Sequence, residues 1–207
     1  MSAPPTVERS APGIGSGDAE GAALAGRLAV DLDGAFEDLV VAYQSRIYGF
    51  ARRLAGNPTD AEEIAQDAFV RAYRALQGYP GERIATLSLR SWIYQIAVNL
   101  ARNRHRDRGR RPSESPLEDE DGRERVLPTG DGADPAATLE RSEGAAALAR
   151  TIAALPPRYR AAVVLRHVEG LSYAEVAVAL DQPVGTAKAN VHRGVKLLRA
   201  ALAEPGE

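Results

Sequence analysis

The residues best suited to bind another molecule lie in Leu171–Arg199, where a short apolar helix, a tight turn and a basic helix are expected in succession. Ser172 is a suitable N-cap for the first helix, and Asp181-Gln182-Pro183 turns the chain. The second helix carries Lys188, Arg193, Lys196 and Arg199 and no acid before Glu204. This order is typical of a helix-turn-helix, whose second helix enters the major groove of DNA.

Helical spacing divides this basic helix into two faces. The face expected to pack inward carries Val184, Ala187, Val191, Val195 and Leu198. The candidate DNA contacts elsewhere on the helix are Thr186, Lys188, Ala189, Asn190, His192, Arg193 and Lys196. Small residues at Ala174, Ala177 and Gly185 are expected to let the two helices approach closely. The alternative is a helical hairpin whose basic face is only solvated.

A second basic segment covers Leu89–Arg111. It opens with apolar residues and ends with six arginines between Arg102 and Arg111, which are interrupted by one aspartate. Guanidinium groups bind phosphates and stack on bases. Aromatic residues occur around the same region, and such side chains suit single-stranded bases. Trp92 taken alone is better explained as a core residue, and the alternative for the arginines is a solvated helix end.

The predicted helix Asp60–Leu76 has an acidic face. At 100° per residue Asp60, Glu63 and Asp67 cluster away from its alanine-rich face. An acidic face would repel DNA and could meet a basic protein partner. On physical grounds alone an ordinary polar face with a local Asp67–Arg71 pair is the better explanation.

Composition excludes several other classes of function. The chain has no Cys and three widely separated His, so neither a thiolate nor a histidine metal site is expected. No phosphate loop, paired catalytic carboxylates or cofactor motif occurs, which argues against an enzyme with a small-molecule substrate. No apolar run approaches the ~20 residues that span a bilayer. The N-terminus lacks the features of a signal peptide. A cytoplasmic protein without membrane insertion is predicted.

The formal net charge of −2 over 207 residues hides a segregated distribution. Residues 1–35 and 113–143 carry −3 and −7, whereas residues 36–112 and 144–207 carry +5 and +3. The acidic segments are rich in Pro and Gly and lack apolar periodicity, so they are expected to be disordered, although residues 21–32 also permit a short helix. The basic segments have helical periodicity throughout, without strand-like alternation. The predicted fold class is all-α, with two small helical domains joined by a flexible acidic linker.

Three stretches together resemble the extracytoplasmic-function (ECF) sigma factors of bacterial RNA polymerase. They are DAEEIAQDAFVRAYRAL at Asp60–Leu76, SWIYQIAVNLARNRHR at Ser91–Arg106, and the long C-terminal stretch Leu155–Leu202 with its helix-turn-helix. The resemblance implies a disordered tail over 1–33, sigma region 2 over 34–111, a disordered linker over 112–142 and sigma region 4 over 143–203. Its implied partners are core RNA polymerase, promoter DNA and an anti-sigma factor, with no cofactor and no metal.

The resemblance also implies roles for particular residues. The acidic face, with Asp60, Glu63, Gln66 and Asp67, would dock on the polymerase, which overturns the explanation preferred on physical grounds. The minus-10 element would be opened and held by Ser88, Arg90, Trp92, Asn99, Arg102, Asn103 and Arg106. The minus-35 element would be read by the helix from Val184 through its candidate DNA contacts.

Two departures from the family pattern bear on specificity. The stretch between Gly81 and Trp92 is longer than usual, which leaves open the residue that captures a flipped minus-10 base. Ala189 and Asn190 stand where the family often has a Ser and an Arg. Without that Arg a phosphate contact or a guanine contact is lost, so an unusual minus-35 sequence is expected. The rival hypothesis is a helix-turn-helix regulator that binds duplex DNA without polymerase.

Overall fold

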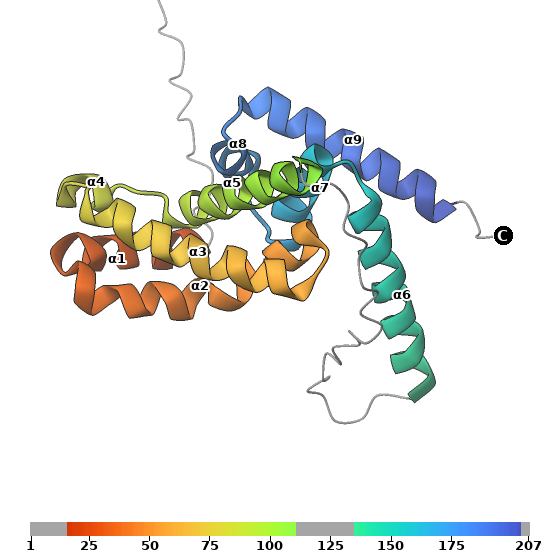
Figure 1. Cartoon of the computed structure of the whole chain (residues 1–207), viewed down its shortest axis with the longest axis horizontal. Helices are drawn as coiled ribbons and strands as arrows, with labels where there is room; N and C mark the ends of the chain where they lie inside the picture. Colours follow the sequence, from red (N-terminus) through yellow and green to blue (C-terminus); the bar gives the residue numbers. More distant parts are fainter. Residues whose placement is uncertain (1–15, 111–134, 204–207) are drawn as a thin grey trace, which may run out of the picture.

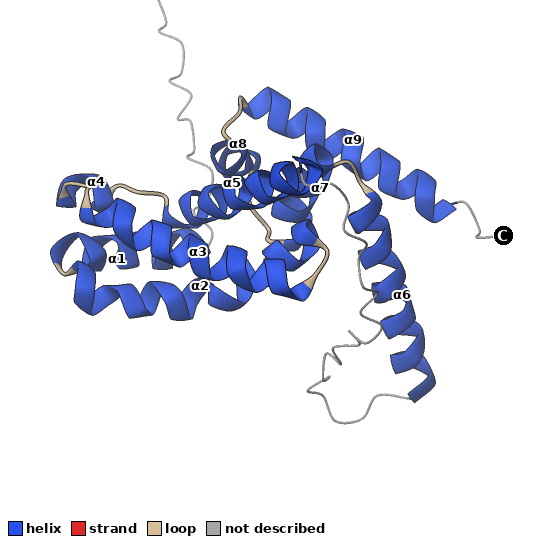
Figure 2. Ribbon diagram, in the orientation of Figure 1, coloured by secondary structure: helices blue, strands red, loops and turns tan. Residues whose placement is uncertain are grey.

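The computed structural model describes residues 16–110 and 135–203, and within these ranges the secondary structure is entirely helical (Figures 1 and 2). The all-α class predicted from the sequence is confirmed. The expectations of disorder for residues 1–15 and 112–134 fall outside the described residues. No helix in the described ranges is both long enough and apolar enough to cross a membrane.

The first module consists of α1 (Ser16–Val30), α2 (Leu32–Ala55), α3 (Pro58–Gln77), the short α4 (Gly81–Ala85) and α5 (Leu89–Arg110). The helix starts follow local rules, since the side chains of Asp31 and Asn57 accept hydrogen bonds from the backbone of Gly34 and Asp60 and so cap α2 and α3. Left-handed Gly56 ends α2. The apolar faces of these helices meet in a core that includes Leu39, Ile47, Phe50, Ile64, Leu76, Ile93 and Val98.

Helix α1 corrects the expectation of a disordered tail over residues 1–33. Residues 16–30 form a regular helix, and Leu24 and Leu28 are almost completely buried in the core of the first module. The nitrogen Nη1 of Arg27 also lies 2.5 Å from the carboxylate of Asp38 on α2. The burial of two leucines four residues apart stabilises a helix that its acidic, Gly-rich sequence signalled only weakly.

The second module contains α6 (Pro135–Ala154), α7 (Pro157–Val163), a π-helical turn η1 (Val164–Val168), α8 (Tyr173–Leu180) and α9 (Val184–Ala203). Ser172 and Glu175 form a reciprocal capping box at the start of α8. Asp181 follows α8 in the left-handed conformation, with φ 53°. Residues 135–142 belong to α6, so the predicted disordered linker over 112–142 is too long at its C-terminal end.

Helices α7 and α9 pack closely at Gly194. A Cβ at this position would lie 2.4 Å from Cγ2 of Val163 and 3.3 Å from Cβ of Tyr159. Gly185 was expected to let α8 and α9 approach closely, but a Cβ there would meet nothing within 4 Å, so this approach does not require a glycine. Val184 was also expected to pack inward, but it is 50% exposed. Ala187, Val191 and Leu198 are buried as predicted.

The two modules pack against each other. Helix α5 of the first module packs against α8 of the second, which is seen nearly end-on in Figure 1, and α2 contacts α6, α7 and η1. Helix α6 projects away from the rest of the described chain (Figure 1). The surfaces of α5 and α9 that carry the candidate binding residues are therefore positioned within one compact arrangement.

We expect Gly194→Ala to lower the free energy of unfolding of the second module by about 1–3 kcal/mol, because the added methyl group overlaps Val163. Gly185→Ala is the matched control, since it has open space and alanine is favoured over glycine in a helix. Urea unfolding followed by circular dichroism measures both variants. Equal stabilities of the two variants would contradict the close approach of α7 and α9.

Candidate nucleic-acid interface

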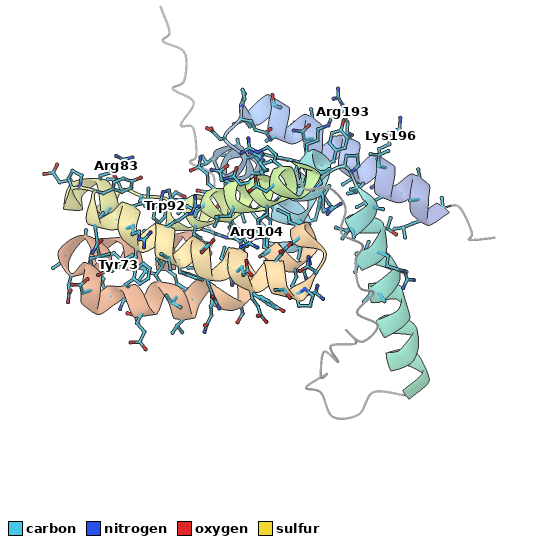
Figure 3. All side chains as sticks on the ribbon, viewed as in Figure 1. Tyr73, Arg83, Trp92, Arg104, Arg193 and Lys196 are labelled. Atoms are coloured by element: carbon cyan, nitrogen blue, oxygen red, sulfur yellow. The ribbon has the colours of Figure 1, made fainter. Side chains whose placement is uncertain are left out.

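Helix α9 presents a basic surface to solvent. Thr186, Lys188, Ala189, His192, Arg193 and Lys196 are all exposed, and five residues (Gly185, Lys188, Ala189, His192, Arg193) line a shallow open hollow. Arg193 and Lys196 project away from the rest of the chain (Figure 3). Asn190 is half-buried, and its side-chain amide donates a 3.2 Å hydrogen bond to Gln182 in the preceding turn. The surface can therefore reach base edges and phosphates without rearrangement of α9.

The candidate minus-10 residues are divided between exposed and covered positions. Ser88, Asn99, Arg102 and Arg106 are exposed, whereas Arg90 and Asn103 are half-buried. Trp92 is 9% exposed and lies in the core beside Tyr79, with ring centroids 6.3 Å apart. This placement agrees with the interpretation of Trp92 as a core residue, which the sequence also favoured.

Arg90 and Arg102 are engaged by the second module. The Arg90 guanidinium donates to the backbone carbonyl of Glu169 and lies 3.9 Å from the carboxylate of Glu175, with both side chains less than a fifth exposed. Both terminal nitrogens of Arg102 lie 3.4 Å from the carbonyl of Leu180. Two side chains that the sequence assigns to the minus-10 element thus help to hold α5 against η1 and α8.

The buried residue Tyr94 forms a polar link between the modules. Its ring packs edge-on against Phe50, with centroids 5.2 Å apart, and its hydroxyl donates a 2.5 Å hydrogen bond to the Glu169 carboxylate. Burial raises the pKa of the Tyr94 hydroxyl far above its usual value, and the hydrogen bond to Glu169 and the charge of that carboxylate raise it further. Tyr94 therefore remains a hydrogen-bond donor throughout the physiological pH range.

The acidic face of α3 is partly neutralised by a residue of α5. The Arg104 guanidinium lies 3.2 Å from Oδ1 of Asp60 and also pairs with the carboxylate of Glu63. Gln66 and Asp67 are exposed, and no ion pair between Asp67 and Arg71 occurs among the described residues. Val70, one turn beyond Gln66 on the same helix, is 46% exposed and adds an apolar contact point that the charge pattern did not indicate.

A cleft of about 670 Å³ lies where the two modules meet, between α5 and α7. One wall carries the predicted residues Asn99, Arg102, Asn103 and Arg106. The other wall carries Arg158 and Arg160, which sequence reasoning did not select. Those two arginines follow the Pro156-Pro157 turn in an otherwise ordinary helix start, so no local pattern marks them. Only the packing of the modules brings them opposite α5.

Comparison with known families decides the identity of the two modules. The sequence pattern of sigma-70 region 2 matches residues 39–111, and that of sigma-70 region 4 matches residues 145–198. The RNA polymerase sigma-H factor of Pseudomonas aeruginosa is 36% identical over 170 residues, which cover 81% of this chain and 86% of that protein. The chain belongs to the ECF sigma factors.

Other ECF sigma factors have similar coverage. SigW of Bacillus subtilis is 34% identical, covering 81% of this chain and 89% of its own, and the sigma-E factor of Escherichia coli is 36% identical, covering 77% and 82%. The chain is thus an RNA polymerase sigma factor, a class of non-catalytic transcription initiation factor.

The fold of this sigma factor is shared with two solved structures. CnrH, in complex with the cytosolic domain of CnrY, superposes with a TM-score of 0.62 at 24% identity, covering 90% of this chain and 99% of that one. The sigma factor RpoE from Bartonella quintana, solved with the anti-sigma factor NepR, gives a TM-score of 0.60 at 21% identity, covering 83% and 98%. Helix α1 precedes the part that matches region 2, yet it completes the core of that module.

The hydrogen bond between the modules can be measured with a double-mutant cycle of Tyr94→Phe and Glu169→Ala. We expect a coupling energy of about 1.5–3 kcal/mol in urea unfolding, as for hydrogen bonds to charged groups. Tyr48→Phe is a matched control, because no hydrogen bond of its hydroxyl occurs among the described residues. Additive effects of Tyr94→Phe and Glu169→Ala would show that the bond contributes nothing between the modules.

Proposed function

We propose that this sigma factor binds core RNA polymerase and directs it to a specific set of promoters, with the minus-35 element recognised as duplex and the minus-10 element as melted single strand. The carrying observation is that two basic surfaces occur on separate modules, on α5 of region 2 and on α9 of region 4. Each surface is matched to a different form of DNA.

Region 4 is suited to duplex DNA. The exposed side of α9 presents Lys188 on one turn and His192 and Arg193 on the next, and α8 with its capping box packs against α9. A helix of this width fits the major groove. Arg193 can read guanine or bind phosphate, whereas Asn190, tied to Gln182, would have to exchange that hydrogen bond for one to a base.

Region 2 is suited to an opened strand. Asn99, Arg102, Asn103 and Arg106 lie on successive turns of α5, and Ser88 is exposed just before its start. Arginine and asparagine side chains can bind phosphates and the edges of unpaired bases. Melting would be driven by binding energy, because unstacking a base costs only a few kcal/mol. Since Trp92 is buried, we assign it to the support of α5 rather than to base stacking.

The arrangement of the two modules also bears on function. Arg90 and Arg102 donate to carbonyls of the second module. Full use of α5 by promoter DNA would therefore require region 4 to move away from region 2. Binding of polymerase would supply the free energy for this separation, so we expect the free protein to bind DNA weakly.

The partners follow from the same assignment. We infer that α3 docks on polymerase through Gln66, Asp67 and the exposed Val70, while Asp60 and Glu63 contribute once their pairing with Arg104 is exchanged or shared. An anti-sigma factor is a further expected partner, because RpoE of Bartonella quintana was solved in complex with the anti-sigma factor NepR. The site of action would be the cytoplasm, where polymerase and promoter DNA are found.

Run-off transcription with purified core polymerase on genomic fragments tests the proposal. We expect discrete promoter-specific transcripts that require the protein. A parallel gel shift with and without core separates this function from that of a duplex-binding regulator, because a sigma factor should bind promoter DNA tightly only when core is present. Absence of any specific transcript from folded, inhibitor-free protein would overturn the proposal.

Asp67→Arg is expected to weaken core binding at least tenfold, because it places a cation at the centre of the exposed acidic face. Glu62→Arg is the matched control, since it makes the same charge change on an exposed residue of α3 that faces a different direction. Fluorescence anisotropy with labelled protein and core measures both affinities. Equal loss in both variants would indicate general electrostatics rather than a docking face.

A further inference from the structure

The cleft between the modules has a composition that the promoter assignment does not explain. Its floor is apolar and is formed by Leu54, Val98, Ala101, Pro157 and Ala161. Its rim carries the side chain of His105 and cationic groups from both modules, with Arg102 and Arg106 on α5 and with Arg158 and Arg160 on α7. Among the residues that the structure describes, none that lines the cleft is acidic.

The cationic groups of the rim have no anionic partners within the part of the chain that the structure describes. The ion pairs present there involve none of them. Arg160 instead donates to the carbonyls of Leu54, Ala153 and Leu155, and burial lowers its pKa. Positively charged side chains from both modules therefore lie close together around the cleft and repel one another. A bound anion would attract all of them and so offset this repulsion.

We propose that this cleft is a nucleotide-binding site built jointly by α5 and α7, with the phosphate held by the arginines and the base on the apolar floor. The side-chain amides of Asn99 and Asn103, which also line the cleft, supply donors and acceptors for a base edge. The volume of about 670 Å³ lies within the range of small-molecule sites, which are mostly apolar with few polar groups. A simple anion would use the rim but leave the floor empty.

The proposal deepens the proposed function, because the α5 wall is the surface assigned there to the minus-10 strand. The ligand chemistry is a base that carries phosphate, supplied either by a free nucleotide or by single-stranded DNA. Arg158 becomes a binding residue of region 4 outside the helix-turn-helix. A ligand that contacts both walls must favour the closed arrangement, since its affinity falls when the modules separate.

Isothermal titration of the full chain, without polymerase or duplex, tests the site with three probes: ATP, inorganic triphosphate and a single-stranded DNA hexamer. We expect ATP or the hexamer to bind at least tenfold more tightly than triphosphate, because only they carry a base for the floor. Tighter binding of ATP identifies a free nucleotide as the ligand, and tighter binding of the hexamer identifies the strand. Triphosphate binding equal to both would overturn the proposal.

Arg158→Gln should lower the affinity of the protein for the tighter-binding of ATP and the hexamer about tenfold, as expected for the loss of one charge-assisted contact. Arg199→Gln is the matched control, because it removes the same charge from an exposed residue of α9 outside the cleft. Arg158 is not used in the proposed promoter contacts, so run-off transcription and nucleotide binding can fail separately. Equal affinities of the two variants would overturn the proposal.

A second readout follows the arrangement of the modules. The chain has no cysteine, so Glu37→Cys and Ala200→Cys introduce two exposed labelling sites, one in each module. Saturating the labelled protein with the probe that binds more tightly, ATP or the hexamer, should increase the fraction of molecules with high energy transfer between the two dyes. In the Arg158→Gln background the same change should require about tenfold more probe, because the affinity is about tenfold lower. A ligand-induced decrease in energy transfer would show that the nucleotide binds one wall only.

Discussion

Helix α5 has to satisfy two neighbours at once, and the rest of the structure depends on this constraint. Its apolar residues, including Ile93, Ala97 and Val98, complete the core of the first module. Tyr94 belongs to that core through its ring, but a buried hydroxyl requires a partner, and the partner is Glu169 of the second module. The packing of region 2 is thereby tied to the position of region 4.

The contacts that join the modules differ in strength. The bond from Tyr94 to Glu169 involves a carboxylate and is partly buried, whereas Arg102 and Arg160 donate to backbone carbonyls. A guanidinium held by carbonyls keeps its charge uncompensated, so another anion can compete for it. An interface made largely of such contacts is well suited to exchange one partner for another, and under the proposed function the new partner of the α5 arginines is nucleic-acid phosphate.

Local chemistry explains which parts could be predicted from the sequence. The helices α2, α3, α8 and α9 follow from apolar periodicity and from caps such as Ser172, and the exposed basic face of α9 follows from the same periodicity. Helix α1 was underestimated because its stability comes from burying Leu24 and Leu28 in a core formed by distant residues. The Tyr94–Glu169 bond joins positions 75 residues apart, and the walls of the cleft meet only after folding. No window of sequence contains such information.

The acidic face shows how the same helix links the two halves of the function. Arg104 of α5 pairs with Asp60 and Glu63 of α3, while Arg102, two residues earlier, points to Leu180 in the second module. Arg104 and Arg102 of α5 therefore contact, respectively, the acidic face that the proposal assigns to polymerase and the module that it assigns to duplex DNA. A basic group of polymerase that approaches Glu63 must share or replace the Arg104 contact. Any shift of α5 that follows would also weaken the hydrogen bonds of Arg102 and Tyr94 to the second module. Docking of polymerase on α3 would in this way favour the separation of the modules.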